Sequence, residues 1–229
     1  MFVLGVDGCR AEPGWVAFKV DVVSRATSVE LIHDLPLKLK TRPSDWARLA
    51  IDIPVGLLDG SRNCDIEARK RLGRKRGTSV FAAPCRAALG IEGHLAMSAM
   101  NKAKTGRGLS LQAYGIAHKI KQVDDAITPV SQEWAFEVHP EVCFWALAGH
   151  PIEPNKKTEK GRDERLKFLR PEFPRIDDHL LKDRQGAGKD DLLDACVAAW
   201  TALRHYNKKA TCVCEPQHDE RGLEACIRY

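Results

Sequence analysis

Hydrophobic and polar positions alternate along several short segments of the chain. The first, MFVLGVDG, predicts a strand that ends at Asp7. The turn residues RAEPG, at 10–14, should return the chain as a hairpin. Similar patterns predict four further strands, at residues 14–20, 26–35, 49–54 and 133–140.

Apolar spacings of three and four residues, together with start and stop signals, predict helices elsewhere. Residues 108–129 carry such a pattern and end at Pro129, and residues 188–206 are apolar on nearly every side, which indicates a buried closing helix. Three shorter helices are expected: 42–49, started by Pro43 and Ser44; 63–73, with Asn63 as N-cap and Gly73 as stop; and 140–149, opened by Pro140. This order of elements predicts an α/β fold with a mixed sheet.

Composition fits a globular protein. The chain has 229 residues, of which 44% are hydrophobic, enough for a single domain over 1–229 with an inserted basic segment at about 55–108. Asp7 interrupts the first apolar segment, which argues against a signal peptide, and no uncharged apolar run reaches the ~18 residues of a membrane span. We therefore expect a cytoplasmic protein that does not bind membranes.

Eight cysteines are scattered through apolar contexts, and nothing points to secretion, so reduced thiols are expected. One alternative stays open in the C-terminal tail, where four residues could surround a zinc ion: Cys212, Cys214, His218 and Cys226. The C-x-C spacing there is tighter than the usual C-x₂₋₄-C of zinc sites, and there is no second cysteine pair.

Positive charge is unevenly distributed, although the net charge is only +5. The segment 62–76 holds seven basic and two acidic residues, and a second basic run covers 156–175. Such runs are hypotheses for phosphate binding, and hence for nucleic acid as a partner, against the alternative of a solvated basic face. The candidate phosphate contacts are Arg62, Arg69, Arg86, Lys157 and Arg165.

Three predicted strands end in a carboxylate: Asp7, Asp52 and Glu137. In each strand the residue two positions earlier is small, namely Gly5, Ala50 and Ala135. Because side chains repeat every second residue along a strand, each acid shares its face with a residue that allows close packing.

The closing helix carries acids beside a stripe of alanines. Asp191 and Asp194 lie on the same side as Ala195, Ala198 and Ala202, so this face can approach the sheet closely. Asp190 and Asp191 can be explained by the positive N-terminus of the helix, whereas Asp194 lies one turn further in.

Electrostatics then favours a metal. Two carboxylates ~4 Å apart at an effective dielectric near 20 repel by about 4 kcal/mol, so several in one pocket need cations. Oxygen ligands without paired His or Cys suit Mg²⁺ or Mn²⁺. The predicted catalytic and metal-binding residues are Asp7, Asp52, Glu137, Asp191 and Asp194.

Six motifs in order resemble the domain-of-unknown-function 429 family, whose members are predicted ribonuclease H-like nucleases. They are GVDGCRAEPGW, AIDIPVGL, RNCDIEARKRLG with SVFAAPCR, LSLQAYGIAHKI, FEVHPEVCF and KDDLLDACVAA, and the resemblance runs from about residue 2 to 205. It implies a five-stranded mixed sheet with its first three strands antiparallel, helices on both faces, and 55–108 inserted after the fourth strand.

The resemblance also implies a site and an activity. Acids of such folds lie on the first strand, the fourth strand and the closing helix, here Asp7, Asp52, Asp191 and Asp194, and Glu137 matches the family's own motif. The implied activity is Mg²⁺- or Mn²⁺-dependent hydrolysis of phosphodiester bonds in nucleic acid. Two alternatives stay open. The first is a non-catalytic nucleic-acid-binding or regulatory module. The second is an actin/sugar-kinase-like phosphotransferase, because VDGCRAEPGW also resembles the phosphate-binding hairpin of those enzymes. DNA or RNA as substrate, and the oligomeric state, are left open.

Overall fold

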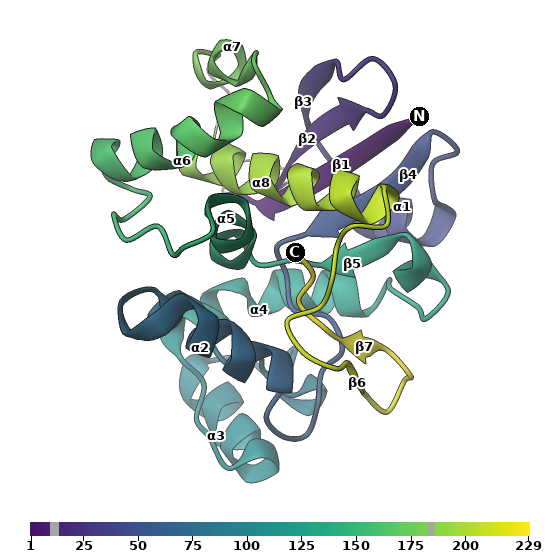
Figure 1. Cartoon of the computed structure of the whole chain (residues 1–229). Helices are drawn as coiled ribbons and strands as arrows, with labels where there is room; N and C mark the ends of the chain where they lie inside the picture. Colours follow the sequence, from purple (N-terminus) through teal and green to yellow (C-terminus); the bar gives the residue numbers. More distant parts are fainter. Residues whose placement is uncertain (10–13, 183–185) are drawn as a thin grey trace.

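The computed structural model describes residues 1–9, 14–182 and 186–229 and shows an α/β fold with a five-stranded mixed sheet (Figure 1). The order is β3-β2-β1-β4-β5; β2 is antiparallel to β1 and β3, β4 is parallel to β1, and β5 is parallel to β4. The strands are β1 Phe2–Gly8, β2 Trp15–Asp21, β3 Thr27–Leu31, β4 Trp46–Ile51 and β5 Ala135–Glu137, and a separate hairpin is formed by β6 Gln217–His218 and β7 Glu224–Ala225.

Helices connect and cover these strands. The α-helices are α1 Leu35–Thr41, α2 Asn63–Arg76, α3 His94–Thr105, α4 Leu111–Asp124, α5 Pro140–Ala148, α6 Glu159–Glu172, α7 Ile176–Leu180 and α8 Lys189–Tyr206. Short 3₁₀ turns are η1 Gly77–Ser79, η2 Arg86–Ala88 and η3 Ser131–Glu133. No helix in the described part of the chain is long and apolar enough to span a membrane.

Alternating side chains of the strands build two apolar layers. Val3 of β1 packs in a cluster with α5, α6 and α8, whereas Leu4 and Val6 pack in a second cluster with α1 and α4. Figure 1 shows α8 crossing the strands, with α5 and α6 on its side of the sheet. The sheet order and the helices on both faces confirm the expected fold class and are compatible with a ribonuclease H-like fold.

The closing helix lies unusually close to β1. A Cβ atom added to Gly5 would lie 2.1 Å from the backbone oxygen of Ala195 and 2.1 Å from the backbone nitrogen of Ala199. No side chain fits in that space, so glycine is required for α8 to contact the strand through its backbone. This confirms the close approach predicted from the small residues on both elements.

The helix predicted at 42–49 is wrong. The helix lies one segment earlier, as α1, where the Asp34 carboxylate accepts a hydrogen bond from the Leu37 backbone at 2.8 Å and a proline occupies the first turn. Trp46 already pairs with Phe2 as the start of β4. The helix-start signals of Asp34 and the following proline therefore outweighed those of Pro43 and Ser44.

The boundaries of α2 also differ from expectation. Its N-cap is Arg62 rather than Asn63, and Gly73, at φ 69°, interrupts the helix rather than ending it. The helix resumes and reaches Arg76. The turn expected at 10–14 lies outside the described residues except for Gly14.

The C-terminal tail is fixed by a disulfide between Cys212 and Cys226. The expectation of reduced thiols is therefore wrong for this pair, while Cys64, Cys85, Cys143 and Cys214 keep free thiols. Two of the four candidate zinc ligands are used in the disulfide, so their sulfurs are not available as thiolate ligands. The tail continues past the edge of the sheet, where the Arg228 backbone donates to the Glu137 carbonyl at 3.1 Å.

Candidate metal centre

Three elements bring together Asp7, Asp52 and Asp194, which we call the acidic triad. Asp7 lies near the end of β1, Asp52 directly follows β4, and Asp194 lies in the second turn of α8. The Asp52 backbone donates to the Val6 carbonyl at 2.9 Å, so strand pairing continues far enough to hold Asp52 beside Asp7. One carboxylate oxygen from each residue lies within 4.8 Å of the other two.

Burial and mutual repulsion act together on the acidic triad. Burial, then the charge of Asp52 and of Asp194, raises the pKa of Asp7 well above its usual value. Burial and the charge of Asp194 do the same to the pKa of Asp52, and burial raises the pKa of Asp194 to about 6 despite the nearby Lys156. Three ionised carboxylates are therefore unfavourable in this cluster, and a bound cation would stabilise them.

Lys156 lies against this cluster and was missed by the sequence reasoning. Its ammonium pairs with Oδ2 of Asp194. Burial alone would lower the pKa of Lys156, but the charges of Asp194 and Asp7 raise it strongly. The available signal is its place in the second basic run, where the predicted phosphate contact is its neighbour Lys157.

The donor set fits a hard divalent ion. All three groups offer carboxylate oxygens, which Mg²⁺ and Mn²⁺ prefer. Oδ1 of Asp194 is buried and finds no hydrogen-bond partner among the residues that the structure describes. A buried carboxylate oxygen normally has a hydrogen-bond partner, so the lack of one at Asp194 Oδ1 is consistent with a role as a metal ligand.

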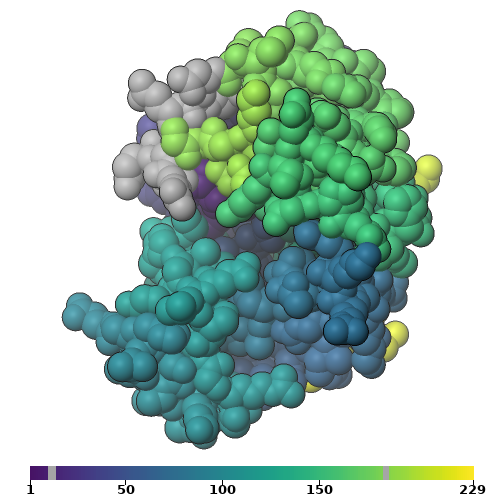
Figure 2. Space-filling view, turned by 90° about the vertical axis from the view of Figure 1, so that its left-hand side faces the viewer, coloured from purple at the N-terminus to yellow at the C-terminus, as the bar shows by residue number. Residues whose placement is uncertain are grey.

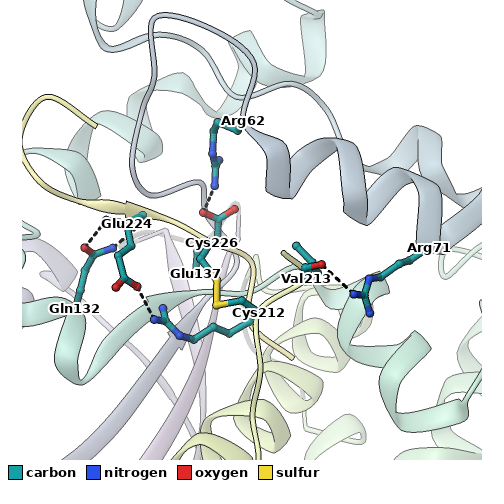
Figure 3. Close-up of a disulfide and its surroundings, with 9 residues drawn as sticks. Arg62, Arg71, Gln132, Glu137, Cys212, Val213, Glu224 and Cys226 are labelled. Atoms are coloured by element: carbon teal, nitrogen blue, oxygen red, sulfur yellow. Dashed lines mark hydrogen bonds and ion pairs between the residues drawn. A yellow bond between two sulfur atoms is a disulfide. The ribbon is translucent and has the colours of Figure 1, made fainter. Parts of the chain in front are cut away.

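Glu137, also predicted as a metal ligand, lines the same cavity as the acidic triad, and its charge raises the pKa of Asp52, but other groups hold its carboxylate. In the register of the parallel strands it pairs with Ile51, one residue before Asp52, so its side chain points to the opposite face of the sheet. There its Oε2 accepts a hydrogen bond from the Val55 backbone at 2.8 Å. The same oxygen pairs with Arg62, and Figure 3 shows this ion pair. Burial raises the pKa of Glu137 to about 7, against the charge of Arg62.

Asp191 caps α8. Its Oδ2 accepts a hydrogen bond from the Gly188 backbone at 2.9 Å. The carboxylate thus lies at the positive N-terminus of the helix, which is the explanation that the sequence offered for it. The residue still lies close enough to raise the pKa of Asp7 and lines the same cavity. Asp191 therefore lies beside the acidic triad and is not one of the three carboxylates that converge there.

The acidic triad opens into a cavity of about 520 Å³. One wall is formed by Lys156 and Lys157 before α6, and another by Phe81 and by Ile116 of α4. In Figure 2 this hollow lies between the green segment that leads into α6 and the blue and teal segments of α2 and α4. The segment that follows β4 in the sequence thus contributes to the walls of the site.

Comparison with known families decides the classification. The family described as "Protein of unknown function (DUF429)" matches residues 5–221. The chain belongs to this family. No curated protein and no solved structure is significantly similar to it. The description of the DUF429 family assigns no activity, so the activity has to be argued from the site.

All four arginines predicted to bind phosphate have other partners in this DUF429 protein. Arg62 and Arg165, 3% and 0% exposed, are buried in ion pairs with Glu137 and Glu141. A phosphate cannot reach either guanidinium group in this structure, so we do not carry these two predictions forward.

The other three candidates differ from one another. Arg86 binds three carboxylates, including that of Asp124 at 2.8 Å, and Arg69 donates to the Val80 carbonyl at 2.7 Å. Lys157 is exposed and lines the cavity, so its phosphate contact stays a prediction. The sequence shows where basic residues lie along the chain, but it does not show which groups they pair with.

Proposed function

We propose that this DUF429 protein is a metal-dependent nuclease that hydrolyses phosphodiester bonds of nucleic acid at the acidic triad. One observation carries the proposal. Three buried or half-buried carboxylates from β1, the end of β4 and α8 converge within 4.8 Å, and an oxygen of one of them lacks a partner in the described part of the chain.

Charge explains why a metal is required for such chemistry. Three carboxylates repel a phosphodiester, so an anionic substrate cannot enter the cavity until the cluster is neutralised. A divalent ion bound there would polarise a phosphoryl oxygen and activate water. The chain itself fixes the ligand oxygens through the β1–β4 pairing and the contact between β1 and α8.

The remaining cavity walls suit a nucleotide segment. Lys157 supplies positive charge for phosphate, while Phe81 and Ile116 offer apolar surface to a sugar or base. The kinase-like alternative gains no support, because those enzymes pair two related domains and the described residues contain one five-stranded sheet.

The test is a nuclease panel of single-stranded DNA, duplex DNA, RNA and branched DNA with Mg²⁺ or Mn²⁺. We expect cleavage of at least one substrate only when metal is present, and a loss of about a hundredfold or more in Asp52→Asn. Asp59→Asn is the matched control, because Asp59 is exposed and does not line the cavity. It should cleave at the wild-type rate.

Two results would contradict the proposal. Equal cleavage by Asp52→Asn and the wild-type protein would place the activity elsewhere. Absence of cleavage on every substrate, in a protein that calorimetry shows to bind Mn²⁺, would leave a metal centre without nuclease activity.

A further inference from the structure

A cation already occupies part of the acidic triad. The ammonium of Lys156 pairs with Oδ2 of Asp194 in α8. The Asp194 side chain is fully buried, whereas the Lys156 side chain is 29% exposed. Lysine usually keeps its charge in water, so an ammonium that points into a carboxylate cluster needs a reason. The charge of the cluster provides it.

The loop that carries Lys156 is built to hold it there. The carbonyl of Asn155 accepts hydrogen bonds from the Thr158 backbone at 2.9 Å and from its hydroxyl at 2.8 Å, and the Asn155 side chain accepts one from the Lys157 backbone at 3.0 Å. A Cβ atom on Gly161 would lie 1.9 Å from the Asn155 carbonyl, so the loop packs tightly on the start of α6.

A buried arginine anchors the same loop from below. Arg165 donates to the Pro154 carbonyl at 2.9 Å and binds both oxygens of Glu141, at 2.7 and 2.9 Å. Bidentate pairs of this kind fix geometry as well as charge. The position of Lys156 is therefore set by a network of contacts and not by the freedom of a surface side chain.

A divalent ion and this ammonium compete for one oxygen cluster. An ion held by the acidic triad would lie within a few ångströms of the Lys156 ammonium, and at that distance two positive charges repel strongly in a partly buried site. We propose that Lys156 is the built-in counter-ion of the metal centre: it offsets part of the negative charge of the acidic triad in the metal-free protein and leaves Asp194 when a divalent ion binds.

This inference rests on the metal centre proposed above and adds its regulation. The lysine stabilises the metal-free protein and weakens metal binding by the same interaction, because any ion must displace it. Since Lys156 lines the cavity, the displaced ammonium stays near the position that an anionic substrate would take.

The first test is titration of the metal-free protein with Mn²⁺ by calorimetry. Lys156→Met keeps the length of the side chain without its charge, and we expect it to bind Mn²⁺ about tenfold or more tightly than the wild-type protein. Lys160→Met is the matched control, because Lys160 is exposed on the neighbouring helix and does not line the cavity. It should leave the affinity unchanged.

Outcomes of this titration separate the two proposals. Equal or weaker binding by folded Lys156→Met overturns the role of Lys156 and leaves the metal centre standing. Absence of Mn²⁺ binding in both proteins overturns the metal centre itself, and the counter-ion role with it.

A second measurement uses the wild-type protein and does not depend on a variant that folds. Acylation of lysines by an amine-reactive reagent, read by mass spectrometry, should be slow at Lys156 without metal and several-fold faster with saturating Mg²⁺, because an ion-paired ammonium is protected. Exposed Lys40 of α1 should react equally in both conditions. A Lys156 that reacts no faster with Mg²⁺ would contradict its displacement.

Discussion

Two groups of buried carboxylates lie near the ends of β4 and β5, and they differ in how their charge is balanced. In the first group Glu137 pairs with Arg62, and Glu141 pairs with Arg165 and Arg76; we call these the arginine-paired acids. The second group is the acidic triad, which lines the same cavity and to which the described part of the chain supplies one ion pair, from Lys156.

The difference distinguishes acids whose charge is compensated within the fold from acids that could bind a ligand. A buried carboxylate with a well-placed arginine is complete, and removing either partner leaves an uncompensated charge. The acidic triad has more negative than positive charge and one oxygen without a partner, so a ligand can complete it. A buried acid whose charge is not fully balanced by nearby cations is therefore a better indication of a ligand-binding site than burial alone.

The largest effect should come from breaking an arginine-paired acid. Arg62→Met leaves Glu137 buried without its partner, and we expect a loss of about 3–5 kcal/mol in the free energy of unfolding, or about 10 °C in melting temperature. Mn²⁺ affinity of the folded fraction should remain, because Arg62 does not contact the acidic triad. Calorimetry and thermal melting measure the two quantities.

Lys75→Met is the comparison variant for Arg62→Met. Its ion pair with Glu153 is exposed on both sides, so its loss should barely change the melting temperature. A melting temperature of Arg62→Met equal to that of Lys75→Met would show that the buried pair does not stabilise the fold.

Gly5→Ala should have an intermediate effect and act on the acidic triad instead. The added methyl group would overlap the backbone of α8, so the helix must move away from β1, at a cost of about 1–3 kcal/mol or more. That movement separates Asp194 from Asp7, and Mn²⁺ affinity should fall together with the melting temperature.

Gly115→Ala controls for the change of residue type. Gly115 lies inside α4 with no atom within 4 Å of an added Cβ, so alanine should raise stability by up to about 1 kcal/mol and leave Mn²⁺ affinity as it is. Unchanged metal binding by Gly5→Ala would argue that the β1–α8 contact does not set the geometry of the acidic triad.

The smallest effect is a pH dependence. Burial raises the pKa of Asp194 to about 6 and that of Glu137 to about 7, both above the unfolded values of about 4. The folded state then binds more protons than the unfolded state, so the melting temperature of the metal-free protein should fall by a few degrees as the pH rises from about 4 to 7.

Excess Mg²⁺ divides this pH dependence between the two groups of acids. A bound ion should remove the pH dependence of the melting temperature that comes from the acidic triad. Glu137→Gln should remove the pH dependence that remains in the presence of Mg²⁺. His205, whose pKa is lowered by burial to about 4, acts in the opposite sense with and without metal, so it cancels in the difference. Identical profiles with and without Mg²⁺ would contradict a metal at the acidic triad.

Much of the fold followed from local patterns. The strands that carry Asp7 and Asp52 and the apolar helix that carries Asp194 have clear periodicity, and Gly5 together with the alanine stripe of α8 indicated their close contact. Charge repulsion then favoured a cation for these acids. This reasoning needs only the residues on each element and the faces they share.

The rest depends on pairings between distant segments. Glu137 ends its strand as Asp52 ends its own, but a register offset of one residue turns the two side chains to opposite faces, and no pattern within either strand fixes that offset. The partners of Arg62 and Arg165 and the position of Lys156 likewise come from loops folded against the sheet. A basic run in the sequence cannot distinguish a phosphate contact from an internal ion pair.

The contact between Gly5 and the backbone of α8 has a consequence for motion. Two ligand-bearing elements touch through main-chain atoms, without flexible side chains between them, so Asp7 and Asp194 cannot drift apart unless the helix lifts from the sheet. Such a displacement opens the core that β1 shares with α8. Local fluctuations therefore leave the spacing of these carboxylates intact, and the two elements separate only in the cooperative step that unfolds the core.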